Sequence, residues 1–199
     1  MVQNLLLIRT GLWQWVQGPG LERVQLLTAP DQWILRGTIL TLAEHGAAEA
    51  RYEIVCDSAW HTRSADISLN DGYSERRLSI RTEHGRWYAN EQLSETVDGC
   101  IDIDLGWSPS TNTLPIRRLQ LDIGQSSGSI VAAWVRFPDL ILEPLPQKYL
   151  RVSDQQYRYS SRGGAFVAEI SVDDQGLILD YEGLWRRVED AKPSSMSNS

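Results

Sequence analysis

The densest group of residues that could do chemistry lies between positions 100 and 119, in the segment CIDIDLGWSPSTNTLPIRRL. Asp102 and Asp104 alternate with isoleucines, so in a strand both carboxylates would lie on one face, roughly 6–7 Å apart. Paired acids at such a separation act as acid and base in glycoside hydrolysis. The same pattern arises when arginines on an adjoining strand neutralise both acids. The segment therefore leaves a catalytic and a structural interpretation open.

Two adjacent arginines follow the acid pair. We expect IRRLQLDIG, residues 116–124, to form a strand, in which Arg117 shares a face with the leucines while Arg118 lies on the other face. A guanidinium that faces apolar surface needs an acidic partner, a wet cavity or an anionic ligand. The loop before it contributes Asn112, whose amide could contact sugar hydroxyls or hydrogen-bond its own turn.

Aromatic side chains with a polar tip form the second group of candidates. The chain has eight tryptophans against two phenylalanines, and an indole combines a broad apolar face with one N–H donor. Such side chains suit a site for a molecule with a sugar and an apolar chain, although they would equally suit the core of a sheet. Arg63, three residues after Trp60, is expected to pair with Asp102 or Asp104. The aromatic candidates are Trp60, Trp134, Tyr157, Tyr159 and Tyr181.

The elements that must position these residues are short strands. Apolar and polar residues alternate repeatedly between Gly, Asp, Asn and Pro, which predicts about a dozen antiparallel strands. This number favours an all-β fold with one large curved sheet or a barrel, built as a single domain from residues 1–188. Residues 137–147 contain three prolines, so we expect an irregular crossing there. Residues 189–199 lack apolar periodicity, which predicts a disordered tail.

Charge and composition exclude several classes of function. The formal net charge of −7 and the sequence pI of about 5.0 argue against a nucleic-acid partner. The apolar run near the start is too short for a signal peptide or a membrane span, so we expect a cytoplasmic protein without a transmembrane segment. Cys56 and Cys100 are expected to be buried, reduced and inert. No phosphate loop, dinucleotide motif, nucleophile elbow or metal-ligand cluster occurs, so we expect no cofactor and no metal.

Several segments resemble one bacterial family. In order along the chain, YEIVCDSAWHTR, CIDIDLGWSPSTNTLPIRRL, VAAWVRFPDL, QKYL, YRYSS and VDDQGLILDYEGLW look like the "putative glycolipid-binding" protein family, formerly a domain of unknown function. The resemblance runs from about residue 50 to 187 and departs at Trp107 and Ser110. It implies a barrel-like antiparallel fold with an apolar groove, similar in outline to the open barrel of bacterial lipoprotein-localisation factors.

Together these observations favour a noncatalytic protein that binds an amphiphilic small molecule, for example a glycolipid. The ligand would occupy an apolar hollow inside the curved sheet, and Arg63, Arg117 and Arg118 would face its polar head at a mouth lined by arginine and aspartate. Two alternatives stay open. One is a hydrolase that cleaves a glycosyl or ester bond with Asp102 and Asp104. The other is an interaction scaffold in which the charged cluster only ties strands together.

Overall fold

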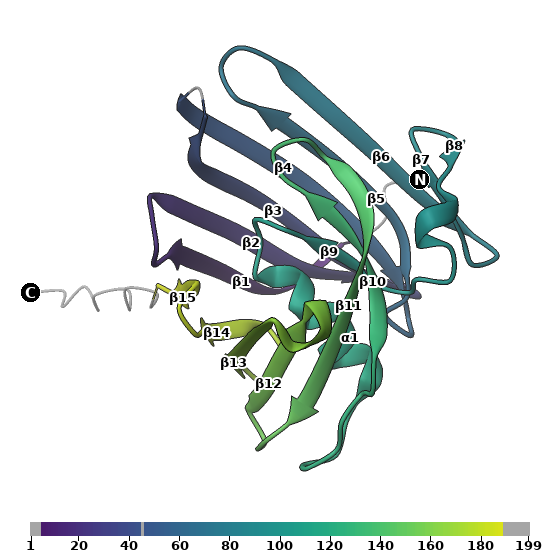
Figure 1. Ribbon diagram of the computed structural model, residues 1–199, viewed down its shortest axis with the longest axis vertical. Coiled ribbons are helices and arrows are strands. Elements are labelled where there is room, and N and C mark those ends of the chain that lie inside the picture. Colours follow the sequence, from purple (N-terminus) through teal and green to yellow (C-terminus); the bar gives the residue numbers. More distant parts are fainter. Residues whose placement is uncertain (1–4, 45, 189–199) are drawn as a thin grey trace, which may run out of the picture.

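The chain folds into one large, strongly curved sheet (Figure 1). The computed structural model describes residues 5–44 and 46–188, so the predicted tail at 189–199 lies outside the described residues. Fifteen strands are hydrogen-bonded in the order β8-β7-β6-β5-β4-β3-β2-β1-β15-β14-β13-β12-β11-β10-β9. All neighbouring strands are antiparallel except β9 and β10, which are parallel. The predicted all-β class is confirmed, and the sheet does not close into a barrel.

Helical segments are few and short among the described residues. The 3-10 turns are η1 (Glu95–Val97), η2 (Ser110–Asn112) and η3 (Arg162–Gly164), and the one α-helix is α1 (Thr113–Leu119). The strands are β1 (Leu6–Trp15), β2 (Gly20–Ala29), β3 (Gln32–Ala43), β4 (Gly46–Asp57), β5 (Thr62–Asn70), β6 (Glu75–Glu83), β7 (Arg86–Ala89), β8 (Gln92–Leu93), β9 (Ile103–Leu105), β10 (Ile130–Arg136), β11 (Ile141–Arg151), β12 (Gln156–Ser161), β13 (Phe166–Val172), β14 (Ile178–Tyr181) and β15 (Trp185–Arg187).

The core lies inside the curve of the sheet. Alternate residues of each long strand point inward, as in β5, where Ala65, Ile67 and Leu69 are buried and the residues between them are more exposed. One edge of the sheet is tied back across this core. The backbone N–H of Thr62 donates to the carbonyl of Ile101 at 3.1 Å, which holds the chain just before β9 against the start of β5.

The interior is not the open hollow that the sequence led us to expect. Segment η2 and helix α1 lie within the curve of the sheet (Figure 1), and Leu114 of α1 is fully buried. Large side chains such as Trp13, Trp87 and Tyr149 fill most of the remaining space. Side chains of the protein therefore occupy the middle of the fold, and the space for a ligand must lie at its margins.

Residues 116–124 were expected to form a strand, and this expectation is wrong. Helix α1 covers the first part of that segment and ends where Gln120 adopts a left-handed conformation with φ of 46°. Pro115 is compatible with the helix because it occupies the first turn, where a backbone N–H has no intrahelical acceptor. In a helix, adjacent side chains diverge around the axis, so the alternation that separated Arg117 from Arg118 does not apply.

The proline-rich segment was expected to be irregular, yet residues 141–147 belong to β11, which lies between β10 and β12. Pro144 and Pro146 pair with Ala133 and Val131 of β10, whereas pairing with β12 begins only at Gln147. The prolines thus occupy the part of the strand that has one partner strand. Their missing N–H groups can face the unpaired side, which removes the usual objection to proline inside a sheet.

Candidate functional site

The best-defined cleft consists of two adjoining compartments. The first, called here the polar compartment, has a volume of about 190 Å³ and lies between β9, η2, β10, β12 and β14. It brings together five of the residues predicted from the sequence, namely Asp104, Asn112, Trp134, Tyr159 and Tyr181. These residues are far apart in the chain and converge because the sheet curls back on itself.

Asp104 is the acid of the polar compartment. One carboxylate oxygen accepts a hydrogen bond from the Thr111 hydroxyl at 3.0 Å, and the other accepts one from the Gln147 amide at 2.5 Å. Among the described residues no arginine or lysine forms an ion pair with it. Burial therefore outweighs the two hydrogen bonds and raises the pKa of Asp104 to about 6. A half-buried carboxylate with neutral neighbours is well suited to accept hydrogen bonds from hydroxyl groups of a ligand.

Aromatic rings form the wall around this acid. Tyr159 lies 6.0 Å from both Phe166 and Tyr181, measured between ring centroids. Arg162, in η3, places its guanidinium 5.4 Å from the ring centroid of Trp134 and provides a cation at the rim. Sugar rings combine apolar C–H faces with hydroxyl groups, so a carboxylate set among aromatic rings can contact both kinds of surface.

The second compartment, called here the apolar compartment, also has a volume of about 190 Å³. Trp15, Ile39, Leu42 and Trp107 line it. It adjoins the polar compartment because Gly106, Leu184 and Trp185 line both. The arrangement thus places an acid-containing space next to a largely hydrocarbon-lined one.

Gly106 has a specific role at this junction. A Cβ atom at that position would lie 3.0 Å from the indole nitrogen of Trp134, which is closer than side chains normally approach. The absence of a side chain lets the indole pack against the backbone. On the other side of the junction, Trp15 and Trp185 are stacked with centroids 6.4 Å apart.

Behind the polar compartment lies a buried acid that the sequence analysis missed. Glu22, on the inward face of β2, is completely buried, and its Oε1 accepts hydrogen bonds from Tyr52 and from Ser108 at 2.7 Å. The Ser110 hydroxyl closes a ring, at 2.7 Å from both the Tyr52 and Ser108 hydroxyls. Ser108 also lines the polar compartment, so the ring adjoins the cleft.

The number of hydrogen atoms available to this ring indicates the protonation state of Glu22. Four contacts join four oxygen atoms, but Tyr52, Ser108 and Ser110 supply only three hydroxyl hydrogens. A protonated Glu22 supplies the fourth when its Oε1 donates to one of the Tyr52 and Ser108 hydroxyls and accepts from the other, so that the hydrogens run one way around the ring. In addition, Oε2 of Glu22 is buried and has no hydrogen-bond partner within the described residues, which is far more costly for a charged oxygen than for a neutral one. Burial accordingly raises the pKa of Glu22 to about 7, despite the hydrogen bonds that lower it.

The backbone is adapted to this ring. Tyr52 and Gly37 are paired on neighbouring strands β4 and β3, and the Tyr52 ring lies over Gly37 to reach Glu22 on β2. Any Cβ atom at position 37 would collide with the phenol ring. Gly37 therefore serves a steric purpose in the middle of a strand, where glycine is otherwise unfavourable.

Asp102 has different surroundings from Asp104. It is 1% exposed and forms a two-pronged ion pair with Arg118, at 2.9 Å to Nε and 2.6 Å to Nη2. Asp102 is thus neutralised by an arginine, as the structural interpretation expected, but this arginine lies on α1 and not on an adjoining strand. This interpretation does not describe Asp104, which has no such partner among the described residues. The two acids consequently do not form an equivalent pair.

The remaining predicted residues lie outside the cleft. Arg63 does not pair with either acid of the 100–119 segment, because its guanidinium donates to Asp57 at 2.6 Å. Trp60 is buried and stacked on Trp33, with centroids 4.6 Å apart. Arg117 and Tyr157 line a separate hollow.

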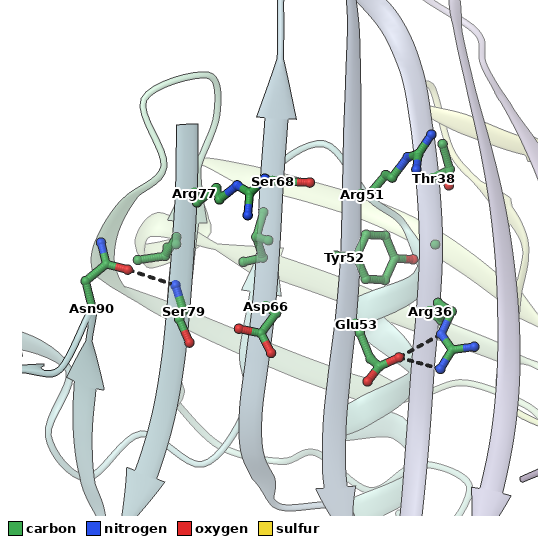
Figure 2. A pocket seen from close by; sticks show the side chains of 13 residues that line it. Arg36, Thr38, Arg51, Tyr52, Glu53, Asp66, Ser68, Arg77, Ser79 and Asn90 are labelled. Carbon is green, nitrogen blue, oxygen red and sulfur yellow. Dashed lines mark hydrogen bonds and ion pairs between the residues drawn. The ribbon is translucent and has the colours of Figure 1, made fainter. Parts of the chain in front are cut away.

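A larger hollow lies on the outer face of β3–β6, with a volume of about 780 Å³ (Figure 2). Figure 2 shows its polar side chains in rows along the strands, with Arg36 of β3 in contact with Glu53 of the neighbouring strand β4. It is shallow, and its long side chains stand on one face of a sheet, so no opposing wall can enclose a ligand. The two-compartment cleft is therefore the better candidate for a specific ligand-binding site.

Sequence signals for the missed residues were present. In β2, alternation places Glu22 with Val24 and Leu26, and an acid on an apolar face is a recognisable anomaly. Arg162 precedes two glycines in a polar stretch, and loop residues of this kind often contribute to binding sites. Trp185 carried no signal beyond its aromatic side chain.

The described residues contain no cluster of His, Cys, Asp and Glu that could hold a metal ion. Within the same part of the chain, no helix is long and apolar enough to cross a membrane. Cys56 and Cys100 are both buried and unpaired. Burial raises the pKa of both thiols, that of Cys100 to about 11.

Comparisons with known proteins agree with this architecture. A crystal structure of a DUF1089 family protein from Pseudomonas aeruginosa is similar, with a TM-score of 0.77 and 33% sequence identity over 85% of this chain and 92% of that chain. No curated protein matches the chain. A family model described as "Putative glycolipid-binding" matches residues 10–187. The chain therefore belongs to this family.

Proposed function

We propose that the protein binds, without chemical conversion, an amphiphile whose head carries sugar-like hydroxyl groups. The head occupies the polar compartment and the apolar part occupies the adjoining apolar compartment. One observation carries this proposal: the carboxylate of Asp104, without a cationic partner among the described residues, sits in an aromatic-walled space that continues into a hydrocarbon-lined one. The family description supports a binding role.

The dimensions of the cleft support a ligand that spans both compartments. Pockets for small molecules usually measure roughly 300–1,000 Å³, and each compartment has about 190 Å³. Neither would hold a complete amphiphile alone. The shared residues Gly106, Leu184 and Trp185 provide the continuity that a spanning ligand needs.

Binding is favoured over hydrolysis because the two acids are not arranged as a catalytic pair. Arg118 donates to both carboxylate oxygens of Asp102 in a buried ion pair, so both oxygens are already engaged with a cation. We further propose a cytoplasmic location, which the two buried, unpaired thiols support. The nature of the head group follows from Asp104, since a carboxylate accepts hydrogen bonds from hydroxyls and repels anionic heads.

Calorimetric titration with octyl glucoside, below its micelle concentration, tests the proposal, and octanol serves as the probe without a sugar. Replacing Asp104 by Asn should weaken octyl glucoside binding about tenfold, because a charge-assisted hydrogen bond becomes a neutral one. It should leave octanol binding nearly unchanged. Trp107→Ala should weaken both probes, since it removes a wall of the apolar compartment.

The matched control is Asp66→Asn, which changes the same charge on the outer face of β5. This variant should bind octyl glucoside like the wild type. Binding that is lost in Asp66→Asn and kept in Asp104→Asn would move the site to the outer hollow and refute the proposal. Native mass spectrometry of the purified protein, which would show a co-purifying amphiphile, provides an independent check.

A further inference from the structure

The hollow that contains Arg117 and Tyr157 is distinct from the cleft. It lies between the end of α1, the segment after β11 and the β13–β14 turn, and has a volume of about 570 Å³. None of its lining residues lines either compartment of the cleft. Arg117 and Arg151 both line it, together with Tyr157.

Arg117 is held in place without an acid. Its guanidinium carbon lies 5.3 Å from the ring centroid of Trp60, and its aliphatic stem packs against Gly176, where a Cβ atom would come within 3.1 Å. Among the residues that the structure describes, its N–H groups have neither a hydrogen-bond acceptor nor an ion-pair partner. A half-buried guanidinium with five free donors is a preorganised site for an anion.

Two further donors converge on the same space. The Tyr157 side chain is buried, and its hydroxyl makes no hydrogen bond within the described part of the chain. Arg151 lies over its ring at 6.0 Å and is fixed by hydrogen bonds to the carbonyls of Leu121, Ser153 and Asp154. Burial raises the pKa of Tyr157, and the positive charges of Arg151 and Arg117 offset only part of this effect.

The acids that border this hollow are largely neutralised by other arginines. Asp173 pairs with Arg187 at 2.8 Å, and Asp174 pairs with Arg9 at 2.7 Å. Asp154 is 3.8 Å from Arg151 and highly exposed, so it compensates that charge only weakly. Each acid that lines the hollow is thus paired with an arginine other than Arg117, and Arg117 has no ion-pair partner among the described residues.

We propose that Arg117, Arg151 and Tyr157 form a second binding site, for a phosphoryl group. Two guanidinium groups and a phenol hydroxyl border one space from three elements, α1, β11 and β12, and such a spread of donors suits a tetrahedral oxyanion better than a planar carboxylate. The phosphoryl group belongs either to a soluble phosphate ester or to a lipid head. This site is independent of the amphiphile cleft.

NMR and calorimetric titrations with inorganic phosphate, glycerol phosphate and acetate test this site at low ionic strength. The wild type should bind both phosphates more tightly than acetate. Arg117→Gln should weaken phosphate binding about tenfold or more, since charged hydrogen bonds are lost. Tyr157→Phe, which removes only a hydroxyl and keeps the ring packing, should weaken it several-fold.

Arg158→Gln is the matched control. Arg158 neighbours Tyr157 in β12, points to the opposite face and pairs with Glu169. Its replacement should leave phosphate binding unchanged. The proposal is overturned if the wild type binds neither phosphate, if acetate binds equally well, or if both site variants keep wild-type affinity.

Vesicles of phosphatidylcholine with and without phosphatidic acid distinguish the two sources of the phosphoryl group. Capture by the phosphatidic acid vesicles that is lost in Arg117→Gln supports a lipid head. Binding of glycerol phosphate alone supports a soluble ester. Octyl glucoside binding should survive in Arg117→Gln, so failure of this site and failure of the amphiphile cleft are separable.

Discussion

Replacing Glu22 by glutamine should remove a pH dependence of stability that the wild type carries. The pKa of Glu22 is raised from 4.5 to about 7 because the carboxyl is fully buried. The folded protein therefore holds a proton on Glu22 that the unfolded chain releases above pH 4.5. Stability from this group is complete below pH 4.5, falls as the pH rises to about 7, and is constant above that.

The magnitude follows from the two pKa values. Each pH unit between them costs about 1.4 kcal/mol, so a rise in pH from 4.5 to about 7 removes roughly 3 kcal/mol of stability. A glutamine at position 22 does not titrate. Its amide leaves buried N–H groups beside the former position of Oε2, so the variant should be less stable than the wild type in acid.

Urea unfolding at about pH 5 and about pH 8 measures the effect as a change in the free energy of unfolding. When the pH rises from about 5 to about 8, the free energy of unfolding of Glu22→Gln should increase by roughly 2–3 kcal/mol relative to that of the wild type. Glu75→Gln, at the exposed start of β6, controls for the loss of one negative charge. If the free energies of unfolding of variant and wild type differ by the same amount at both pH values, Glu22 is ionised in the folded protein. This result would refute the hydrogen count for the ring.

Three other predictions concern packing, charge and the thiols. Gly37→Ala should lower the free energy of unfolding by roughly 2–3 kcal/mol through its collision with Tyr52, and urea unfolding in a Tyr52→Ala background should show most of this cost abolished. Asp102→Asn should cost roughly 3–5 kcal/mol because Arg118 loses its partner; a double variant that also replaces Arg118 by Met should cost less than the sum of the two single changes, and additive costs would contradict coupling. Both cysteines should resist alkylation in the native protein at neutral pH and react after unfolding, as mass spectrometry would show.

The fold was largely predictable because alternation of apolar and polar residues directly reflects one buried and one exposed face. The errors came where tertiary context overrides local pattern. In residues 116–124, Leu119, Leu121 and Ile123 alternate as in a strand, yet the first residues form α1 because the loop before them is packed inside the sheet. Pro144 and Pro146 led us to expect an irregular segment. Their pairing with β10 on one side only is a property of the assembled sheet, so the sequence does not reveal it.

The candidate site was only partly predictable for a related reason. Residue type identified Asp104, Asn112 and Trp134 as candidates, because the binding chemistry of carboxylate, amide and indole groups is known from the residue type alone. Partners across the sheet could not be assigned, since pairing depends on where strands curl. Arg63 was matched to the wrong acid for this reason, although Asp57 lies six residues away in the sequence.

The ring around Glu22 and the polar compartment share one short segment, and this gives the buried acid a role in shaping the cleft. Ser108 and Ser110 face Glu22, while Thr111 donates to Asp104. Because neighbouring residues of one tight turn cannot move independently, the conformation that closes the ring also aims the Thr111 hydroxyl at Asp104. A charged Glu22 would strain that conformation and with it the position of Asp104. We therefore propose that the serines of this loop shape the proposed binding cleft through the geometry that they impose.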